Sequence, residues 1–323
     1  MENLKGKTAF ITGGASGIGL GTAKAMAKEG MNIVLADFRQ SALDEALVWF
    51  KEGGYPAIGV LLDVTDREGY EKAADQAEAA FGKIHVLDNN AGIGIGEPKF
   101  AEGQYSYKDI DFAVDVNYKG VMNGLCVIIP RILKHGEGGH IVSTASKAGL
   151  VPVPGFPLYN SLKMAVITLM ETMYCDLKKV NIGASVFCPG PFVTNLGASS
   201  MELRSKHFGI EMPKFEAPKP PKDGEKAPAR PPRPDFGDVD FGRIQRDPLE
   251  AGERIVRGIK RGDLYIISHS EFKKGWDARA AAISRAFPDE EPYEPFYKIF
   301  GMLAYNPIFE DQTQVPAYHK GEV

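Results

Sequence analysis

Short apolar runs and longer amphipathic segments follow one another along the first part of the chain. The runs "TAFIT", "NIVLAD" and "AIGVLLD" are apolar and rich in β-branched residues, which predicts buried strands. The segments between them, such as "LGTAKAMAKEG", read as helices that end at a glycine. Strands that alternate with helices indicate an α/β protein with a doubly wound parallel sheet, covered by helices on both faces.

The same order continues to about residue 195. "IHVLDNNAG", "GHIVSTASKAG" and "IGASVFCPGPFVT" predict three further strands, each followed by a loop. "YKDIDFAVDVNYKGVMNGLCVIIPRILKHG" and "YNSLKMAVITLMETMYCDLKKVN" predict two long helices. Because ligands of such sheets bind at the carboxyl ends of the strands, we expect the functional site in the loops there.

The rest of the chain departs from this order. Residues 212–234 hold eight prolines in 23 residues, a density that blocks helix and strand and favours extended polyproline conformation; a disordered, solvated loop is the alternative. "DPLEAGERIVRGIKRG" predicts a helix, "DLYIIS" a last strand, and residues 270–323 a helical C-terminal extension. The extension is rich in aromatic residues, so we expect it to pack on its own domain or on a partner subunit.

Composition excludes several classes of protein. The 323 residues are 44% hydrophobic and 25% charged, with a net charge of -4, which is typical of a globular enzyme and gives no basic footprint for nucleic acid. We expect no membrane span and no signal peptide, and hence a cytoplasmic protein. The three cysteines are expected to be buried free thiols. The six histidines show no pair at metal-ligand spacing, so we predict no metal.

Glycines gather where the first predicted strand meets the first helix, in "TGGASGIG". Gly13 allows the tight turn, Gly17 lets the backbone approach a pyrophosphate, and Gly19 lets the helix pack closely on the strand. The N-terminus of the helix then presents free N–H groups to the phosphates. A glycine-rich βα turn without a ligand is the alternative, since the pattern is weak when it stands alone.

The second predicted strand ends at an acid, Asp37. A carboxylate there accepts both hydroxyls of an adenosine ribose and repels a 2′-phosphate, which favours NAD over NADP. Arg39 argues for NADP instead, because an arginine at this place can bind the 2′-phosphate. A helix-cap role for Asp37 is the alternative reading.

Four motifs occur in order: Thr12-Gly13-x-x-x-Gly17-Ile18-Gly19, Asn89-Asn90-Ala91-Gly92, Tyr159-x-x-x-Lys163 and Pro189-Gly190. With them, the chain resembles the short-chain dehydrogenase/reductase family over about residues 5 to 195, and the strand near 264–268 extends the resemblance. The family implies a single Rossmann-type domain over residues 1–323, a nicotinamide cofactor, and hydride transfer at a carbonyl or alcohol carbon. It also implies that residues 197–245 form a lid over the substrate.

The resemblance implies four catalytic residues: Asn117, Ser146, Tyr159 and Lys163. Tyr159 and Lys163 lie four residues apart on a predicted helix, so both side chains face the same side. The lysine ammonium and the nicotinamide ring of NAD⁺ would favour the phenolate, which would exchange a proton with the substrate oxygen. Ser146 would stabilise charge on that oxygen, whereas Ser143 is structural. Asn117 would kink its helix and hold a water next to Lys163; a core asparagine bonded to the backbone is the alternative.

The cofactor set combines the glycine loop, the acid of the second strand and the family positions on later loops. Asp63 and Val64 are expected at the adenine, Asn90 on its ribose side, and the loop after Pro189 at the nicotinamide carboxamide. One residue departs from the family pattern: Asp88 stands where an apolar residue is usual, and we assign it no role. The predicted cofactor-binding residues are Gly13, Ser16, Gly17, Ile18, Gly19, Asp37, Asp63, Val64, Asn90, Ala91, Gly92, Tyr159, Lys163, Pro189, Gly190, Val193 and Thr194.

The substrate is inferred from the loops around the tyrosine. Val153, Phe156 and Phe192, together with Ser146 and Tyr159, are the predicted substrate residues. The loops contain no arginine or lysine near these positions, which favours a bulky apolar or aromatic secondary alcohol or ketone over a small anionic acid. The last strand and the long lid resemble the Cα-dehydrogenases that oxidise benzylic alcohols of lignin-derived aryl ethers. Hydroxysteroid dehydrogenases and general ketone reductases are alternatives, and so is a non-catalytic NAD(H)-binding regulator. We expect a homodimer or homotetramer.

Overall fold

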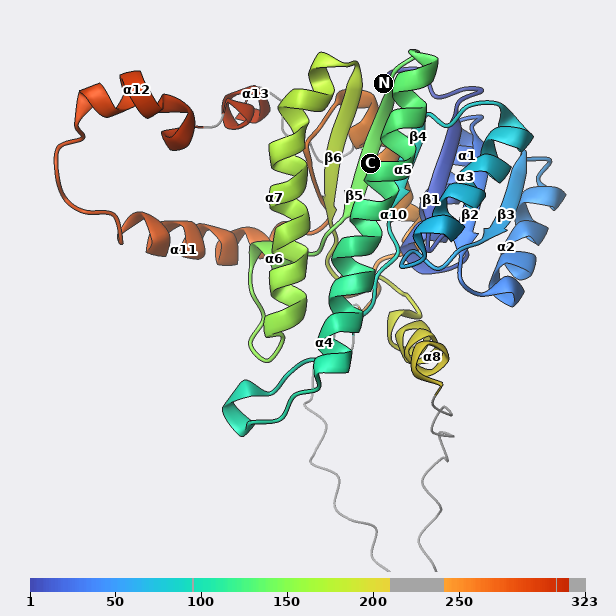
Figure 1. The fold of residues 1–323 in the computed structure, drawn as a ribbon, viewed down its shortest axis with the longest axis horizontal. Helices are drawn as coiled ribbons and strands as arrows, with labels where there is room; N and C mark the ends of the chain where they lie inside the picture. Colours follow the sequence, from blue (N-terminus) through green and yellow to red (C-terminus); the bar gives the residue numbers. More distant parts are fainter. Residues whose placement is uncertain (95, 210–240, 306, 314–323) are drawn as a thin grey trace, which may run out of the picture.

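Seven parallel strands form the centre of the molecule in a computed structural model that describes residues 1–94, 96–209, 241–305 and 307–313 (Figure 1). They lie in the order β3-β2-β1-β4-β5-β6-β7. The predicted doubly wound parallel sheet is therefore confirmed. The strands are β1 Thr8–Thr12, β2 Asn32–Asp37, β3 Ala57–Leu61, β4 Val86–Asn89, β5 Gly139–Thr144, β6 Ile182–Cys188 and β7 Tyr265–Ile267.

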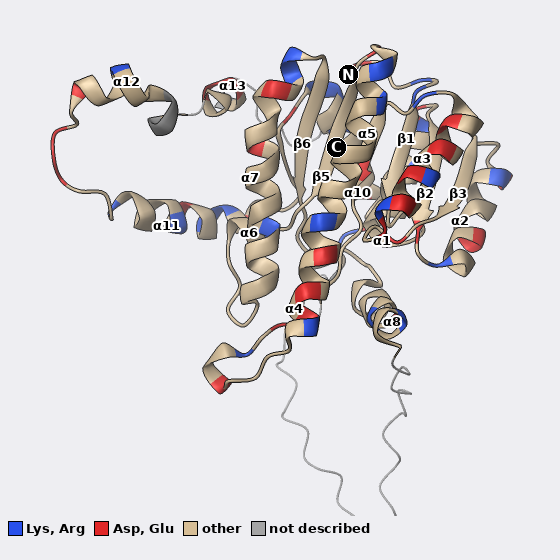
Figure 2. Ribbon diagram, in the orientation of Figure 1, with Lys and Arg blue, Asp and Glu red and all other residues tan. Residues whose placement is uncertain are grey.

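Helices cover both faces of this sheet and bury one hydrophobic cluster on each face. The first cluster joins the sheet to α3, α5 and α7, and the second joins it to α1, α2 and α10. Figure 2 shows the charged residues mainly on helices and loops, with the strands almost free of them, as burial on both faces requires. The helices are α1 Gly17–Lys28, α2 Gln40–Glu52, α3 Arg67–Phe81, α4 Tyr107–Val114, α5 Gly120–His135, α6 Lys147–Leu150, α7 Pro157–Lys179, α8 Leu196–Phe208, α9 Phe241–Ile244, α10 Pro248–Arg261, α11 Lys273–Ser284, α12 Glu294–Ala304 and α13 Ile308–Thr313.

The helix predicted after the fourth strand runs continuously from Tyr107 to His135, with a π-helical turn at Asp115–Lys119 between α4 and α5. By length and composition alone this helix could cross a membrane, although we expected no membrane span from the sequence. Of its most apolar stretch, 61% is buried inside the protein. The apolar face therefore belongs to a core helix that packs against β4 and α3.

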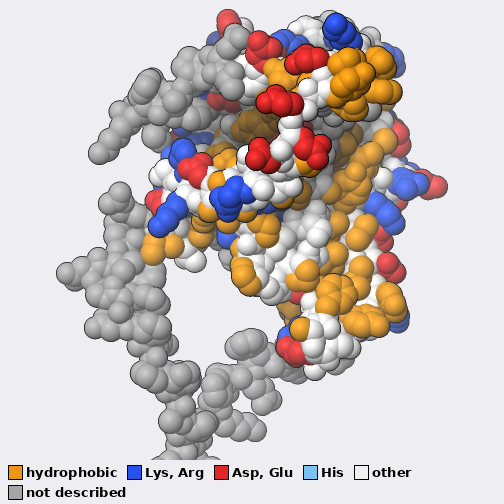
Figure 3. All heavy atoms as spheres, turned by 90° about the vertical axis from the view of Figure 1, so that its left-hand side faces the viewer, with side chains coloured by type: hydrophobic (Ala, Val, Ile, Leu, Met, Phe, Trp, Pro, Cys, Tyr) orange, Lys and Arg blue, Asp and Glu red, His pale blue; other side chains and the backbone are white. Residues whose placement is uncertain are grey.

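The C-terminal extension forms an arm that leaves the domain and returns to it (Figure 1). Its last described helix, α13, docks on the domain, where Ile308 is fully buried and Gln312 donates a hydrogen bond to the Tyr174 hydroxyl of α7. Between the domain and α13 the arm exposes large hydrophobic side chains on the side of the molecule seen in Figure 3. They include Trp276, Ile283, Phe287, Tyr293, Phe296, Tyr297, Ile299, Phe300 and Tyr305.

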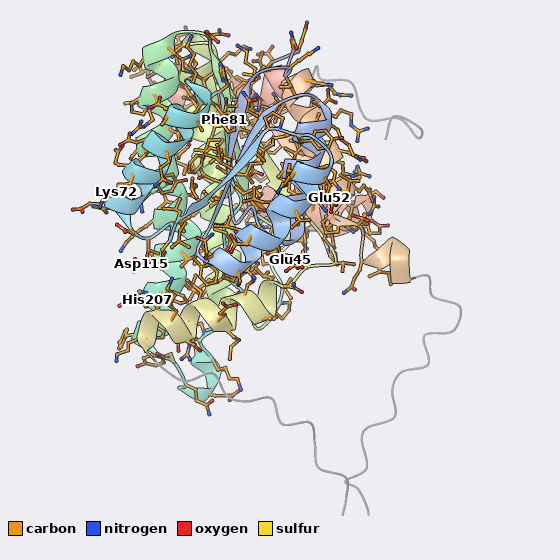
Figure 4. All side chains as sticks on the ribbon, turned by 90° about the vertical axis from the view of Figure 1, so that its right-hand side faces the viewer. Glu45, Glu52, Lys72, Phe81, Asp115 and His207 are labelled. Carbon is orange, nitrogen blue, oxygen red and sulfur yellow. The ribbon has the colours of Figure 1, made fainter. Side chains whose placement is uncertain are left out.

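Part of the expected lid lies outside the described residues, and the expected burial of the cysteines is confirmed only in part. Residues 210–240, which include the proline-rich stretch 212–234, lie outside the described residues. The start of the expected lid is α8, which lies near the π-helical turn, as His207 and Asp115 show in Figure 4. The cysteines are free thiols, but the expectation that all are buried was wrong: Cys126 is exposed on the outer face of α5 and Cys188 is buried.

Candidate active site

A cavity of about 290 Å³ lies at the carboxyl ends of the strands, where the sequence analysis placed the site. Most of the predicted site residues line it. They are Gly13, Ser16, Gly17, Ile18, Asp37, Asp63, Val64, Asn90, Ala91, Gly92, Ser146, Tyr159, Lys163, Pro189, Gly190, Phe192 and Thr194. Residues from at least six loops and helices therefore meet at one hollow.

The glycine loop has a shape that only glycine permits. Gly13 has a φ of +62°, and a Cβ there would lie 3.0 Å from the Asn90 Nδ2. A Cβ on Gly19 would lie 2.3 Å from the Gly13 carbonyl oxygen, so Gly19 lies beneath the loop rather than on the cavity wall. α1 begins directly after the loop at Gly17, with its first amide groups at the cavity. Free amides at a helix N-terminus and a bare backbone fit a pyrophosphate.

Asp37 ends β2 and accepts four hydrogen bonds from nearby groups. They come from the Ala15 amide at 3.3 Å, from the backbone amide and the Nε of Arg39, both at 3.2 Å, and from the Arg39 Nη2 at 3.5 Å. Arg39 also donates from Nη2 to the Ser16 hydroxyl at 2.8 Å. The carboxylate and the guanidinium thus share the corner of the cavity where an adenosine ribose is expected, and Arg39 is already paired with the acid.

Thr12 links the ends of β1 and β4 by hydrogen bonds, a role that the sequence analysis did not assign. Its hydroxyl donates to the Asp88 carbonyl oxygen and accepts from the amides of Asn90 and Ala91. The Asn90 Nδ2 donates back to the Thr12 carbonyl oxygen at 3.0 Å. This reciprocal set fixes the Asn-Asn-Ala-Gly turn beside the glycine loop. The signal was the threonine at the start of the glycine motif.

Tyr159, Lys163 and Ser146 also line the cavity. Lys163 is almost fully buried, its Nζ lies 5.7 Å from the centre of the Tyr159 ring, and it donates to the Thr144 carbonyl oxygen at 3.0 Å. Burial lowers the pKa of Lys163 to about 8. The Ser146 hydroxyl accepts from the Ala148 amide and so caps α6, which fixes the position of the serine.

The pKa of Tyr159 differs from the sequence-based expectation. Burial raises it, a hydrogen bond from Ser146 lowers it, and the charge of Glu97 raises it. We expected the neighbouring lysine to lower this pKa. Burial has the larger effect on the pKa, because the phenolate of a buried tyrosine loses its hydration and is thereby destabilised.

Asn117 lies in the π-helical turn and is buried behind the cavity wall. Its Oδ1 accepts from the Ile93 amide and its Nδ2 donates to the Ile93 carbonyl oxygen, both at 3.1 Å. These bonds agree with the alternative that we gave for Asn117, a core asparagine bonded to the backbone. A Cβ on Gly92 would lie 2.9 Å from the Asn117 Oδ1 and 3.3 Å from the Lys163 Nζ. Asn117 therefore borders Lys163 as well, across a glycine.

Several predicted residues lie outside the cavity lining within the described part of the chain. Val153 bonds to the side chain of Asn160, and Phe156 is exposed at the start of α7. Val193 faces a neighbouring groove on α1. Phe192 borders the cavity, yet it is buried and packs its ring on Phe187, so it serves the core as well.

Residues that the sequence analysis missed form the apolar part of the wall. α8 contributes Leu196, Ser199 and Leu203. Its position depends on contacts with α4: Arg204 donates two hydrogen bonds to Asp109, and the Phe112 ring lies against His207. No local pattern in the sequence indicated which face of α8 would turn inward. The missed lining residues are Phe38, Leu62, Ile93, Val116, Thr144, Ala145, Pro191, Asn195, Leu196, Ser199 and Leu203, and the weighed but unassigned Arg39 joins them.

Asp88 is fully buried in the middle of β4, between Ile11 of β1 and Val142 of β5. Among the described residues neither of its carboxylate oxygens has a hydrogen-bond partner. Burial raises its pKa to about 8. Its side chain therefore lies in the core, where a carboxyl group is costly to ionise.

The fold also brings together a group that no spacing in the sequence indicated: His85, His135 and Glu137. Their possible ligand atoms lie within 4.8 Å of one another. The ring nitrogens are already engaged, since His85 accepts from the Thr8 amide and bonds to Glu137, and His135 bonds to the Ile84 carbonyl oxygen and the Glu137 amide. Two lysines also pair with Glu137. We interpret the group as an ion-pair network.

Comparison with known proteins identifies the family of this chain. The family model of the short chain dehydrogenases matches residues 7–204. The C alpha-dehydrogenase of Sphingobium sp. strain SYK-6 is 32% identical over 321 residues, which are 98% of this chain and 97% of that protein.

Solved structures agree with this assignment. The apo form of LigO from the same Sphingobium strain has 30% identity and a TM-score of 0.70, covering 94% of this chain and 98% of its own. A short chain dehydrogenase/reductase from Burkholderia phymatum in complex with NAD has 30% identity and a TM-score of 0.74, covering 91% of this chain and 99% of its own. Both resemblances in the sequence, to the family and to the Cα-dehydrogenases, are confirmed. The chain belongs to the short chain dehydrogenase family and is an oxidoreductase.

Proposed function

We propose that this protein interconverts a secondary alcohol and a ketone by hydride transfer with NAD, with Tyr159 as the acid/base. The observation that carries the proposal is the meeting of three side chains, Ser146, Tyr159 and Lys163, in the cavity that also contains the glycine loop and Asp37. The cofactor is NAD: the Burkholderia relative is in complex with NAD, and the acid at the end of β2 suits a ribose without a phosphate.

The residues of the cavity supply the proton chemistry. NAD, when bound, takes up the hydride from the alcohol carbon. Tyr159 accepts the hydroxyl proton of the alcohol at its Oη, and the electrons of that O–H bond complete the carbonyl group. Ser146 donates a hydrogen bond to the substrate oxygen and stabilises the charge that develops there. Lys163, whose pKa of about 8 lies near neutrality, can then pass the proton on.

We further propose a bulky apolar or aromatic substrate, of the benzylic type. Ile93, Leu196 and Leu203 give the cavity an apolar side next to Ser146 and Tyr159. The Sphingobium relative named C alpha-dehydrogenase matches this chain to its C-terminal part, far beyond residues 7–204. Residues 197–245 are proposed as a lid, supported by the cavity-lining residues of α8.

The test is a set of turnover measurements that follow NADH absorbance. A panel of benzylic secondary alcohols, hydroxysteroids and simple aliphatic alcohols is offered with NAD and, separately, with NADP. We expect turnover with NAD and the highest kcat/KM for a benzylic alcohol. Replacing Tyr159 by Phe should remove nearly all turnover and leave NAD binding intact, because only one hydroxyl is lost. Preference for hydroxysteroids would select the alternative substrate, and NAD binding without any turnover would support a regulator.

We propose a cytoplasmic homodimer or homotetramer whose contacts include the arm. The exposed Phe296 and Ile299 of α12 support this, because an apolar patch of this kind is costly in water. Mass in solution, measured by light scattering, should exceed one chain. Replacing Phe296 and Ile299 by Glu should reduce that mass, and an unchanged monomeric mass for the native protein would refute the proposal.

A further inference from the structure

The loop after β4 contacts the first turn of α7, the helix of Tyr159. Glu97 lies on this loop and is partly buried. Its Oε2 accepts from the Leu158 amide at 3.0 Å and its Oε1 accepts from the Tyr159 amide at 2.8 Å. One carboxylate therefore makes both contacts from a position 61 residues away in the chain.

These two bonds complete the N-terminus of α7. A helix leaves its first amides without partners inside the helix. Here the first residue, Pro157, has no N–H, and the Asn160 amide bonds to the Phe156 carbonyl oxygen. Phe156, at the N-cap position, has no hydrogen-bonding group in its side chain. The Leu158 and Tyr159 amides are the two that still need an acceptor, and both donate to the Glu97 carboxylate.

The loop that carries Glu97 is itself firmly held. The Ile93 backbone exchanges two hydrogen bonds with Asn117, and the Gly94 amide donates to the Ser200 hydroxyl of α8. Gly96 has a φ of +80°, and a Cβ there would lie 3.0 Å from the Asp109 Cβ. The start of the loop is therefore bonded to the π-helical turn and to α8, and Gly96, next to Glu97, lies close to α4.

We infer that Glu97 is a positioning residue that caps α7 at Tyr159 and tunes the affinity of the Tyr159 hydroxyl for its proton. This inference rests on the proposed role of Tyr159 as acid/base. By fixing the Tyr159 backbone, Glu97 keeps the hydroxyl at the reacting oxygen, where a misplacement of about 1 Å can cost on the order of 100-fold in rate. By its negative charge, it opposes formation of the phenolate.

The charges that face Tyr159 work in opposite directions. Lys163 approaches from the next turn of α7 and favours the phenolate, and its neighbour on β6 is the buried thiol of Cys188. Glu97 approaches from the loop and raises the pKa of Tyr159. Burial raises the pKa of Tyr159 most and the Ser146 hydrogen bond lowers it, so Glu97 adds its charge to an already shifted group and helps to set the pH range in which Tyr159 can accept a proton.

Two substitutions separate position from charge. Glu97→Gln keeps the size of the side chain and one acceptor oxygen but removes the charge, and Glu97→Ala removes the cap entirely. Glu102→Gln is the matched control, since Glu102 lies on the same loop, is exposed, and has its side chain paired with Lys99. The pH profile of kcat for alcohol oxidation is measured for each variant, together with NAD affinity, the melting temperature, and a near-ultraviolet tyrosinate titration in which Tyr159→Phe is the blank.

We expect Glu97→Gln to shift both the pH profile and the Tyr159 titration to lower pH, because an opposing charge is lost. Glu97→Ala should lower kcat by about 10- to 100-fold while NAD affinity changes little. Glu102→Gln should match the native protein. A purely structural cap would lower the melting temperature and leave both titrations in place, and that result would overturn the inference. If Tyr159→Phe retains turnover, the proposed function fails, but the tyrosinate titration still tests Glu97.

Discussion

Asp88 offers the sharpest test of the physical reasoning about this core. We consider its replacement by Val, the kind of residue that suits a strand buried on both faces. Burial raises the pKa of Asp88 from 3.8 to about 8, and each pKa unit corresponds to about 1.36 kcal/mol of differential interaction. Forcing the buried carboxyl to ionise therefore costs roughly 6 kcal/mol.

The sign of the pH dependence follows from the direction of this shift. The folded-state pKa lies above the unfolded value, so the unfolded chain releases its proton first. The contribution of Asp88 to the free energy of unfolding is therefore highest below about pH 4, where the carboxyl is neutral in both states. It falls as the pH rises through 8, because the unfolded chain then carries the charge at no cost. Between pH 5 and pH 8, the native protein should lose about 4 kcal/mol of unfolding free energy relative to Asp88→Val.

The assay is urea unfolding of both proteins at a series of pH values and one fixed protein concentration, since assembly would otherwise change the apparent stability. Asp88→Asn serves as a second variant that cannot ionise and keeps the shape. Asp111→Asn, an exposed acid on α4, is the control and should follow the native pH dependence. If the difference between the native protein and Asp88→Val is the same at pH 5 and pH 8, the carboxyl is not desolvated and the reasoning is refuted.

Three further predictions address the site. Ser146→Ala should reduce kcat by about 100-fold or more, because it removes a donor to the reacting oxygen, whereas Ser143→Ala should have a mild effect; equal effects in steady-state kinetics would contradict the assignment. Asp37→Ala should improve kcat/KM for NADP relative to NAD by about 1–3 kcal/mol, and a native preference for NADP would mean that Arg39 prevails. Deleting residues 212–234 should raise KM for bulky substrates with little change in NAD affinity; unchanged kinetics would favour a spacer.

The sequence determined the architecture and most of the cavity wall. Alternating strands and helices are encoded by local periodicity, and a parallel sheet then brings all carboxyl ends to one edge. For this reason the sequence alone predicts that residues as far apart as Gly13, Asp37 and Tyr159 belong to one site, and all three line the cavity. The Tyr159-x-x-x-Lys163 spacing likewise places both side chains on one helix face, whatever the tertiary structure.

Only the tertiary structure decided which groups meet across long stretches of chain and how deeply each is buried. Glu97 caps α7 from a loop, and α8 turns Leu196 and Leu203 towards the cavity, because contacts with α4 and α7 hold them there. Burial also sets the pKa values of Asp88 and Tyr159, which residue identity alone leaves near their usual range. The physical reason is that periodicity specifies local structure, whereas desolvation and long-range hydrogen bonds depend on packing that the whole chain makes together.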